Sequence, residues 1–354
     1  MSRFFSNKYS ELKPYVPGEQ PKDRRYIKLN TNESPFQPSI KAQEYAARAS
    51  QSLQLYSDPD CTAITDRMAQ IYGVKPSQVF FGNGSDEVLY LAFLAYCDVR
   101  TPAYFPDITY GFYKVFAQFL GIPYEQIALN RDFSIPIEQF YGVDGTIFIA
   151  NPNAPTGKLL SIIQIEQILQ QNLDHVVVVD EAYIDFGGES AVKLIEKYEN
   201  LLVTQTFSKS RSLAGARLGM AFGNEALITD LRTAKFSINP YNVNSMTMAA
   251  GLGALEDDAY TKENCATIIE NREYTTKMLR HLNFTVLDSL ANFVMASSPV
   301  ISGGELYSAL KQRGILVRYF DSERLRSYVR ITIGTREQMD ALLAAIREIL
   351  EVSQ

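Results

Sequence analysis

Lys209 occurs at a position where its amine could act as a nucleophile. Residues 201–207 form an apolar run rich in β-branched residues, typical of a buried strand, and Lys209 follows two residues later. An amine held against a buried sheet loses solvation, which favours its neutral form and makes it a nucleophile towards an aldehyde. The donors of Ser208, Ser210 and Arg217 would suit a phosphate beside that aldehyde. The same residues also suit a solvated turn with an ordinary surface arginine, because short motifs often occur by chance.

A second predicted strand ends in an acid. Four consecutive valines, Val176–Val179, are typical of a strand covered on both faces, as in a parallel sheet. Asp180 then stands at the carboxyl end of the strand, where open α/β sheets bind their ligands, and Tyr183 follows it. An acid in this position also suits the magnesium site of a nucleotide hydrolase. That reading requires a GxxxxGK[ST] loop, which the chain lacks.

A glycine-rich turn could hold an anion. The strand predicted at 79–81 leads through this turn into a helix predicted at 88–96. Free amides at Gly84, Ser85 and Asp86 would point at a bound phosphate. The alternative is a capped helix with acids in its first turn, which the helix dipole favours without any ligand.

Further groups belong to predicted strand ends and turns. Most aromatic clusters are core, but Tyr110 follows a turn in such a cluster and is the residue we expect over a ring. The strand predicted at 146–150 ends in a proline-rich loop that contains Asn153 and exposes backbone amides. Arg330 alternates within a strand, where an arginine is costly unless paired, so it is expected to bind an anionic substrate or to form an interdomain salt bridge.

These groups need a scaffold, and the chain predicts one of two parts. Strands alternate with helices from about residue 78 to 222, the pattern of a mostly parallel sheet with helices on both faces. A polar segment with three prolines precedes this region and predicts an extended arm. Beyond Gly223 the chain is expected to be helical through 241–244 and 258–281. A smaller α+β domain is then expected, with strands at 284–287, 293–296, 315–318 and 329–333 and helices at 304–313 and 335–352.

Composition narrows the class of protein. Of 354 residues, 46% are hydrophobic, which allows a sizeable core, and 34 Lys+Arg against 40 Asp+Glu give a net charge of −6 without a dense basic run. We therefore expect no nucleic-acid partner. No apolar run approaches the roughly 18 residues that a membrane span needs, and no signal segment is seen, so a cytoplasmic protein is expected. Three cysteines and two histidines lack metal-ligand spacing, so no metal is expected.

Taken together, the motifs resemble one enzyme family. In order they are LNTNESP, YSDPDCTAI, GNGSDEVL, TYGFY, NPNAPTG, VVVVDEAYIDF, TFSKSRSLAGARLG and YVRITIGT. This order, over almost the whole chain, resembles the histidinol-phosphate aminotransferase family within the class-II aminotransferases, which are fold-type I pyridoxal-phosphate enzymes. The resemblance implies a mostly parallel, seven-stranded-type sheet with helices on both faces. It also implies an arm at 1–28 packing with the small domain, a large cofactor-binding domain at 29–255 and a small domain at 256–354.

The resemblance implies roles for individual residues. Lys209 would form the Schiff base with pyridoxal 5'-phosphate, and Asp180 would pair with its ring nitrogen. Tyr183 would bond the phenolic oxygen, and Tyr110 would stack on the ring. The phosphate would be held by backbone and side chains of the glycine turn and the lysine loop, namely Gly84, Ser85, Asp86, Ser208 and Arg217.

Other implied roles concern the substrate and a second subunit. Tyr56 is expected to reach the neighbouring subunit's cofactor, which implies a homodimer. Substrate-binding residues would be Tyr15, Asn32, Tyr56, Arg318 and Arg330. The family usually has NPNNPTG, and its asparagine before Pro-Thr-Gly contacts the cofactor; here that position is Ala154, so Asn153 is expected to serve instead.

The implied reaction is amino transfer in histidine biosynthesis. Histidinol phosphate and 2-oxoglutarate would give imidazole acetol phosphate and glutamate. An aromatic amino acid aminotransferase and a threonine-phosphate decarboxylase share these features, so they remain alternatives. A protein of a different class, which binds pyridoxal phosphate without turnover, is the third alternative.

Overall fold

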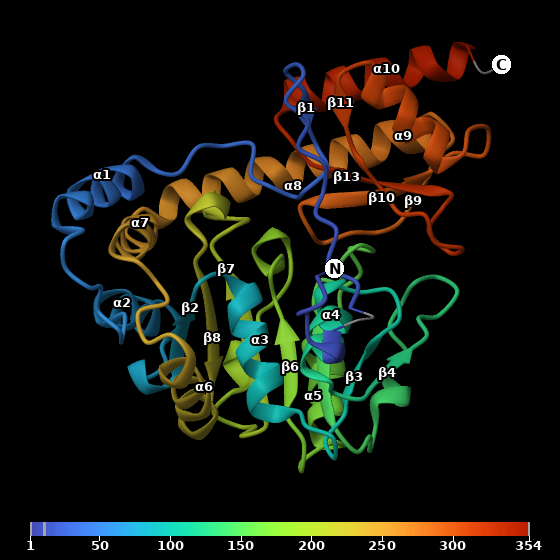
Figure 1. Ribbon diagram of the computed structural model, residues 1–354. Coiled ribbons are helices and arrows are strands. Elements are labelled where there is room, and N and C mark those ends of the chain that lie inside the picture. Colours follow the sequence, from blue (N-terminus) through green and yellow to red (C-terminus); the bar gives the residue numbers. More distant parts are fainter. Residues whose placement is uncertain (1, 10–11, 353–354) are drawn as a thin grey trace.

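The structure is a computed structural model, and it describes residues 2–9 and 12–352. Met1, Ser10 and Glu11 of the predicted arm lie outside the described residues, as do Ser353 and Gln354 at the end of the predicted small domain. The chain forms a large lower part around one sheet and a smaller upper part, joined by the long helix α8 (Asp258–His281) (Figure 1). None of the described helices has both the length and the apolar sequence that crossing a membrane requires.

Seven strands form the central sheet, in the order β2-β8-β7-β6-β5-β3-β4. All neighbours pair in parallel except β8, which runs antiparallel to both β2 and β7. The predicted mostly parallel sheet is therefore confirmed. The strands are β2 (Val79–Gly82), β3 (Ala103–Pro106), β4 (Tyr124–Ile127), β5 (Thr146–Ala150), β6 (Val177–Asp180), β7 (Leu201–Thr206) and β8 (Gly219–Gly223).

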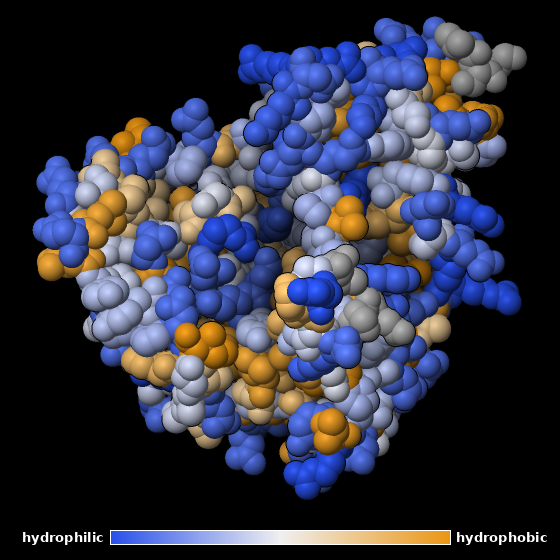
Figure 2. Space-filling view, in the orientation of Figure 1, coloured by the Kyte–Doolittle hydropathy of each residue, from blue (hydrophilic) through white to orange (hydrophobic). Residues whose placement is uncertain are grey.

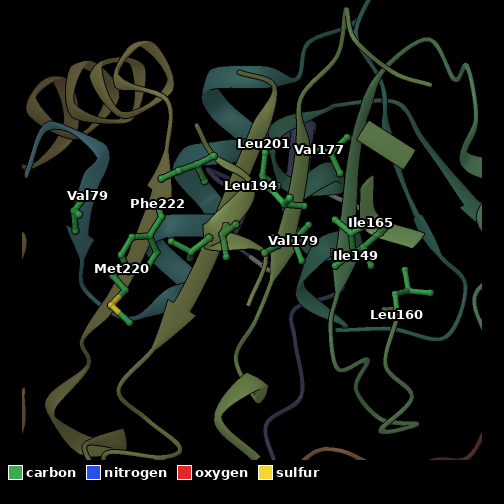
Figure 3. Close-up of a cluster of buried hydrophobic side chains, with 14 of the residues drawn as sticks. Val79, Ile149, Leu160, Ile165, Val177, Val179, Leu194, Leu201, Met220 and Phe222 are labelled. Carbon is green, nitrogen blue, oxygen red and sulfur yellow. The ribbon is translucent and has the colours of Figure 1, made fainter. Parts of the chain in front are cut away.

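The central strands are apolar on both faces because helices cover both sides. In β5, Ile147 and Ile149 join one buried cluster, whereas Phe148 and Ala150 point to the opposite face and join another. This alternation follows from the two-residue period of a strand. Figure 3 shows the first cluster between neighbouring strands. The helices around the sheet are α1 (Ile40–Ala49), α2 (Thr62–Tyr72), α3 (Ser85–Tyr96), α4 (Phe112–Leu120), α5 (Ile162–Gln170), α6 (Glu225–Ile238) and α7 (Ser245–Leu255).

Three strands of the sheet, β3, β4 and β8, were not predicted. The sequence of β8, GMAFG, has a glycine at each end, and glycine is unfavourable in strands. β3 has the sequence AYFP, which belongs to the same aromatic cluster as Tyr110 and ends in a proline. β4 lies at the edge of the sheet, and its Glu125 and Gln126 are exposed. Proline in β3 and the polar pair in β4 interrupt the apolar run, so pairing in the sheet decides the conformation of these two strands.

Two helix boundaries also differ from the prediction. α3 begins at Ser85, three residues before the predicted start, because Gly84 adopts φ +84° at the N-cap and lets the chain turn directly into the helix. Residues 241–244, expected to be helical, form the connection between α6 and α7. Asn244 ends this connection as the N-cap of α7, and its side chain accepts a hydrogen bond from the Thr247 amide.

The small domain is built on a second sheet in the order β12-β13-β10-β9, with antiparallel neighbours. The strand predicted at 315–318 is in fact two strands. Its first half pairs in parallel with β1, and its second half joins the second sheet. The elements are β1 (Ile27–Lys28), β9 (Thr285–Val286), β10 (Phe293–Ser297), α9 (Gly303–Gln312), β11 (Ile315–Leu316), β12 (Arg318–Tyr319), β13 (Tyr328–Thr332) and α10 (Arg336–Val352).

The N-terminal segment contacts both parts of the molecule. The ring of Tyr9 stacks on Phe119 with 5.0 Å between ring centres, and the ring of Tyr15 stacks on Phe112 at 4.3 Å. Both phenylalanines belong to α4 of the large part, whereas β1 pairs with a strand of the small part. The segment therefore crosses the boundary between the two, which brings Tyr15 to the space between them.

Candidate active site

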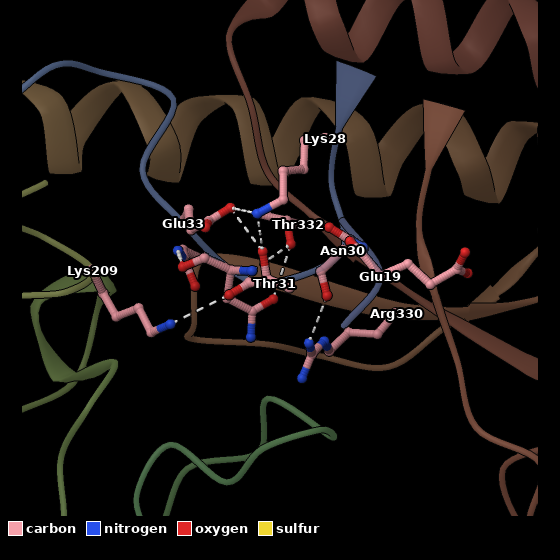
Figure 4. Close-up of polar contacts among 10 residues, drawn as sticks. Glu19, Lys28, Asn30, Thr31, Glu33, Lys209, Arg330 and Thr332 are labelled. Atoms are coloured by element: carbon pink, nitrogen blue, oxygen red, sulfur yellow. Dashed lines mark hydrogen bonds and ion pairs between the residues drawn. The ribbon is translucent and has the colours of Figure 1, made fainter. Parts of the chain in front are cut away.

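Lys209 lies in the turn that follows β7, before a short 3-10 helix at Ala214–Ala216. Its Nζ donates to the Thr31 carbonyl oxygen at 3.3 Å and lies 5.8 Å from the centre of the Tyr183 ring (Figure 4). Among the described residues, that carbonyl is its only hydrogen-bond partner. The amine therefore lies at the end of the sheet and forms no ion pair with a carboxylate in the described part of the chain.

Asp180 is the last residue of the neighbouring strand β6 and is 4% exposed. Its Oδ2 accepts a hydrogen bond from the Tyr113 hydroxyl at 3.0 Å, and its Oδ1 accepts one from the Thr204 hydroxyl at 3.2 Å. Burial raises the pKa of this carboxyl from 3.8 to about 6, although both hydroxyls lower it. No cation of the described residues forms an ion pair with it. The site thus holds a buried acid that would gain from a cationic partner.

Two adjoining hollows share these groups. One of about 470 Å³ reaches towards the small domain, and one of about 450 Å³ reaches towards α3. Lys209, Tyr183 and Tyr110 line both, and Asp180 lines the second. Figure 2 shows the surface hollowed between the small domain above and the large domain below.

The first turn of α3 and the segment after Lys209 form an anion cradle. The first amides of a helix have no partner within the helix, so the turn at Ser85 offers donors to the second hollow. Arg217 adopts φ +58° and lies so close that a side chain at Gly84 would stand 2.5 Å from its Nη2. Ser208 is buried beside it and lines the same hollow. Glycine at position 84 thus keeps the approach to the guanidinium open.

The Asp86 side chain, predicted to help hold the phosphate, bonds two other side chains in the structure. Its Oδ1 accepts a hydrogen bond from the Tyr110 hydroxyl at 2.5 Å, and its Oδ2 pairs with Arg217 Nη2 at 2.9 Å. A carboxylate only accepts hydrogen bonds, so this side chain would repel a phosphate rather than hold it. The geometry instead gives it the task of orienting Tyr110 and Arg217, while its backbone amide stays in the cradle.

The Tyr183 hydroxyl is oriented by Asn32, which Thr332 of the small domain holds in turn. Its hydroxyl oxygen accepts a hydrogen bond from Asn32 Nδ2 at 3.0 Å, and Asn32 Oδ1 accepts one from the Thr332 hydroxyl at 2.9 Å. Asn32 is 1% exposed and adopts φ +57°, a conformation that asparagine tolerates better than most residues. Asn32 thus reaches the site through Tyr183, and it also lines the first hollow.

The two predicted arginines meet in the first hollow, together with Tyr15. Arg330 lies with its guanidinium carbon 5.2 Å from the Phe293 ring centre and donates to the Asn30 carbonyl oxygen at 3.0 Å (Figure 4). Its Nε is buried without a partner among the described residues, and burial lowers its pKa. Arg318 donates only to carbonyl oxygens of the arm. Among residues 2–9 and 12–352, no carboxylate pairs with either arginine, so the interdomain salt bridge considered for Arg330 is not formed there and both side chains are available to an anion.

Asn153 does not line either hollow. Its side-chain nitrogen donates to the Ile108 carbonyl and the Thr156 hydroxyl, and its oxygen accepts from the Thr109 hydroxyl. The residue is completely buried, and these bonds use its amide to hold the loop at 108–109. The structure therefore gives no support to Asn153 as a replacement for the family's asparagine; Ala154 lines both hollows instead.

Tyr56 lies apart from the hollows of its own chain. It is 84% exposed, and its ring stacks on Tyr241 with 4.5 Å between ring centres. Its predicted role concerns a neighbouring subunit, so its position in the single chain does not test that role.

Several residues at or beside the site had no role predicted from the sequence. Thr31, Gln20 and Glu33 line the second hollow, yet they come from the arm and the turn after β1. Tyr113 and Thr204 bond Asp180 from α4 and β7. Thr204 faces Asp180 because the two are paired in register on adjacent strands, which a correct strand alignment could have indicated.

A hollow of about 570 Å³ lies elsewhere, beside α8 and the segment at 287–290. Its arginines are already bonded: Arg280 pairs with Asp288 at 2.9 Å, and Arg272 donates to the carbonyls of Phe186 and Ala291. It contains neither Lys209 nor Asp180, so we place the active site between the domains.

Known proteins place this geometry in a family. The model of aminotransferase class I and II matches residues 24–346. Histidinol-phosphate aminotransferases of Clostridium beijerinckii and Marinomonas sp. are 47% and 50% identical, covering 100% and 99% of this chain and 99% and 100% of their own. The solved histidinol-phosphate aminotransferase of Sinorhizobium meliloti, in complex with pyridoxal-5'-phosphate, is 21% identical with a TM-score of 0.89, covering 100% of this chain and 99% of its own. At that identity the solved structure shows the shared fold. The chain therefore belongs to the class I and II aminotransferases and, within them, to the histidinol-phosphate aminotransferases.

Proposed function

We propose that the chain transfers the amino group of histidinol phosphate to 2-oxoglutarate, giving imidazole acetol phosphate and glutamate. The observation that carries this proposal is a pair of adjoining hollows that share Lys209. One contains the buried acid Asp180 from the neighbouring strand end, and the other contains two arginines that pair with no carboxylate of the described residues. The relatives that carry this name match over their whole length.

The residues present fit pyridoxal 5'-phosphate. A phosphate suits the cradle of α3 amides, Ser208 and Arg217, where glycine leaves the approach open. A protonated ring nitrogen suits Asp180, which is buried without a cation. An aldehyde suits Lys209, whose amine has a single carbonyl partner. The three features therefore match the phosphate, the ring nitrogen and the aldehyde of pyridoxal 5'-phosphate.

Each residue then has a task at a stated atom. The chemistry that pyridoxal phosphate supplies when bound is an electron sink for the pair left when the substrate's Cα proton departs. Asp180 keeps the proton on the ring nitrogen, and Tyr183 donates to the phenolic oxygen while Asn32 fixes its direction. Lys209 moves the proton at the substrate's Cα as base and acid.

Arg318 and Arg330 would bind the anionic ends of both substrates. A guanidinium offers forked donors that match a phosphate or a carboxylate, so one pair can serve histidinol phosphate in one half of the reaction and the dicarboxylate in the other. Tyr15 closes the same wall of the cavity, and burial raises the pKa of its hydroxyl, so it stays a donor. These side chains also exclude water from the Cα of the substrate.

We further propose a homodimer in the cytoplasm. Leu53, Leu55, Tyr56, Ile238 and Tyr241 are exposed apolar side chains at the ends of α1 and α6, where a second copy would cover them. Such a copy would bring its Tyr56 towards the cavity of this one, as the family resemblance implies.

The experiment is a side-by-side assay of the purified chain with histidinol phosphate, aromatic amino acids and threonine phosphate. We expect the highest kcat/KM for histidinol phosphate with 2-oxoglutarate. Better turnover of phenylalanine or tyrosine would make the chain an aromatic aminotransferase, and carbon dioxide release from threonine phosphate would make it a decarboxylase. Borohydride reduction followed by peptide mapping should label Lys209, and a label on another lysine would refute its assignment.

A further inference from the structure

A buried hydroxyl beneath the cavity carries a further inference. Tyr113 is completely buried on the inner side of α4, where its ring meets Phe105 edge-on at 5.9 Å and Tyr110 at 5.7 Å. Its ring therefore belongs to the core, but its hydroxyl donates to Asp180 Oδ2 at 3.0 Å. A phenylalanine would fill the same space, and a buried hydroxyl is costly unless it is bonded. The hydroxyl is thus the part of this residue that packing alone does not explain.

The two carboxylate oxygens of Asp180 have one hydroxyl donor each. Tyr113 bonds Oδ2 from α4, and Thr204 bonds Oδ1 from β7, so the plane of the carboxylate is fixed from two elements. Both are neutral donors that favour the charged form of the acid, as does the Ala182 backbone amide, whereas the nearby Asp86 charge raises the pKa of Asp180. Burial and the nearby Asp180 charge raise the pKa of Tyr113 well above its usual value, so its hydroxyl remains protonated and can donate.

We propose that Tyr113 is a positioning residue for the cofactor: with Thr204 it fixes the Asp180 carboxylate and keeps it ionised to receive the protonated ring nitrogen. This inference rests on the proposed function and extends it to two residues outside the cavity lining that touches the substrate. It also explains how an acid that burial alone would neutralise is available as an anion at neutral pH. Ionisation needs support here because no cation of the described residues pairs with the acid.

The test uses the cofactor-free full chain and its Tyr113→Phe, Thr204→Val and Tyr90→Phe variants, each with Asp180 and with Asp180→Asn. Tyr90 is the matched control, because its ring lies 5.8 Å from Phe116 of the same helix α4 and its hydroxyl has no hydrogen bond among the described residues. Dissociation of pyridoxal phosphate is measured by equilibrium dialysis across pH, and circular dichroism confirms the fold of each variant.

We expect Tyr113→Phe to weaken cofactor binding about tenfold to a hundredfold at neutral pH, the range for a hydrogen bond to a charged group. Because the lost bond favours the anion, the pH below which affinity falls should move upward. Thr204→Val should shift it in the same direction, whereas Tyr90→Phe should leave it in place. In the Asp180→Asn background, Tyr113→Phe should cause little further loss.

The contrary outcomes are distinct. If the parent chain takes up no pyridoxal phosphate, the proposed function fails. If the parent binds pyridoxal phosphate and Tyr113→Phe changes neither the affinity nor the pH below which affinity falls, the tyrosine only fills space and the inference is wrong. An equal loss in both Asp180 backgrounds also refutes it. Should Tyr113→Phe not fold, Thr204→Val decides, since no change in the pH below which affinity falls would exclude the ionising role.

Discussion

Arg330 shows at the residue scale how burial prepares a binding group. Its guanidinium carbon lies 5.2 Å and 5.6 Å from the ring centres of Phe293 and Phe320, and its one hydrogen-bond partner among the described residues is the Asn30 carbonyl. A partly buried cation with no carboxylate from the described residues is costly, so the fold gains when an anion binds. This cost explains why an arginine inside a strand marks a site.

Arg330→Ala is therefore expected to weaken substrate capture. The loss of a charge-assisted bond is worth about 1.5–3 kcal/mol, roughly tenfold to a hundredfold in kcat/KM, mainly through KM. Arg313→Ala is the control, because Arg313 pairs with Glu348 outside the cavity. Steady-state kinetics with histidinol phosphate measures both, and an unchanged kcat/KM in Arg330→Ala would exclude the role.

Asp180 predicts a pH dependence of stability in the cofactor-free chain. Its pKa is raised from 3.8 to about 6 by burial, so the folded state holds the proton more tightly than the unfolded state. The contribution of Asp180 to the free energy of unfolding is fully present below about pH 4 and is lost as the pH rises through about 6. Glu181, also buried, has a pKa raised to about 7 and adds to the same fall.

Asp180→Asn should remove this penalty. We expect it to raise the free energy of unfolding at about pH 8 by on the order of 2 kcal/mol and to change it much less at about pH 4. Urea unfolding of the cofactor-free chain at both pH values measures this. An equal gain at both would mean that the effect is packing rather than charge. The stabilised variant should also lose its hold on the cofactor, so a residue kept for function costs stability.

At the scale of elements, the segment at 320–328 joins the small domain to the large one. Arg324 Nη1 pairs with Asp107 Oδ2 at 3.4 Å and donates to the Leu129 carbonyl at 3.0 Å, and its Nη2 donates to the Asn130 carbonyl at 2.7 Å. Leu325 beside it is 5% exposed and belongs to the core of the large domain. Asp107 thus belongs to an interdomain contact.

Arg324→Ala is expected to loosen this contact. The loss of three bonds at a partly exposed site should cost about 1–2 kcal/mol and increase amide hydrogen exchange in 320–328. Arg326→Ala is the control two residues away, since that exposed side chain has no hydrogen bond among the described residues. Equal exchange in the two variants would show that Leu325 and its neighbours hold the segment without the arginine.

At the scale of the whole molecule, the exposed apolar side chains around Tyr56 predict association. Leu55 is 66% exposed beside Tyr56, and burying such residues in a second copy would remove apolar area from water. Leu55→Glu should shift the protein from dimer to monomer in sedimentation at micromolar concentration. Val99→Glu, at a site 76% exposed after α3, is the control and should stay dimeric. A parent chain that sediments as a monomer at every concentration contradicts the homodimer.

The division at residues 28/29 and 255/256 stays a prediction. α7 ends at Leu255 and α8 begins at Asp258, so the second boundary falls between two helices. α8 itself runs from the large part to the small one (Figure 1). The N-terminal arm contacts both parts. Measurements of domain motion would show with which part it moves.

Long or strongly patterned elements could be predicted from the sequence. The valine run of β6 and the β-branched run of β7 determined their strands, and the strand ends then placed Asp180 and Lys209 at one edge of the sheet. These predictions succeeded because a buried parallel strand needs an unbroken apolar run, which the sequence shows directly. β3 and β4 were missed because a proline in one and a polar pair in the other interrupt the apolar run that marks β6.

What each polar atom bonds was decided only by the tertiary structure. The family resemblance implied that Asp86 helps to hold the phosphate and that Asn153 contacts the cofactor, and Tyr113 had no assigned role. The structure instead directs Asp86 to Tyr110 and Arg217, Asn153 to its own loop, and Tyr113 to Asp180. The physical reason is that the sequence determines which donors and acceptors exist and which strands are buried, whereas hydrogen bonds form between groups that only folding brings within about 3 Å.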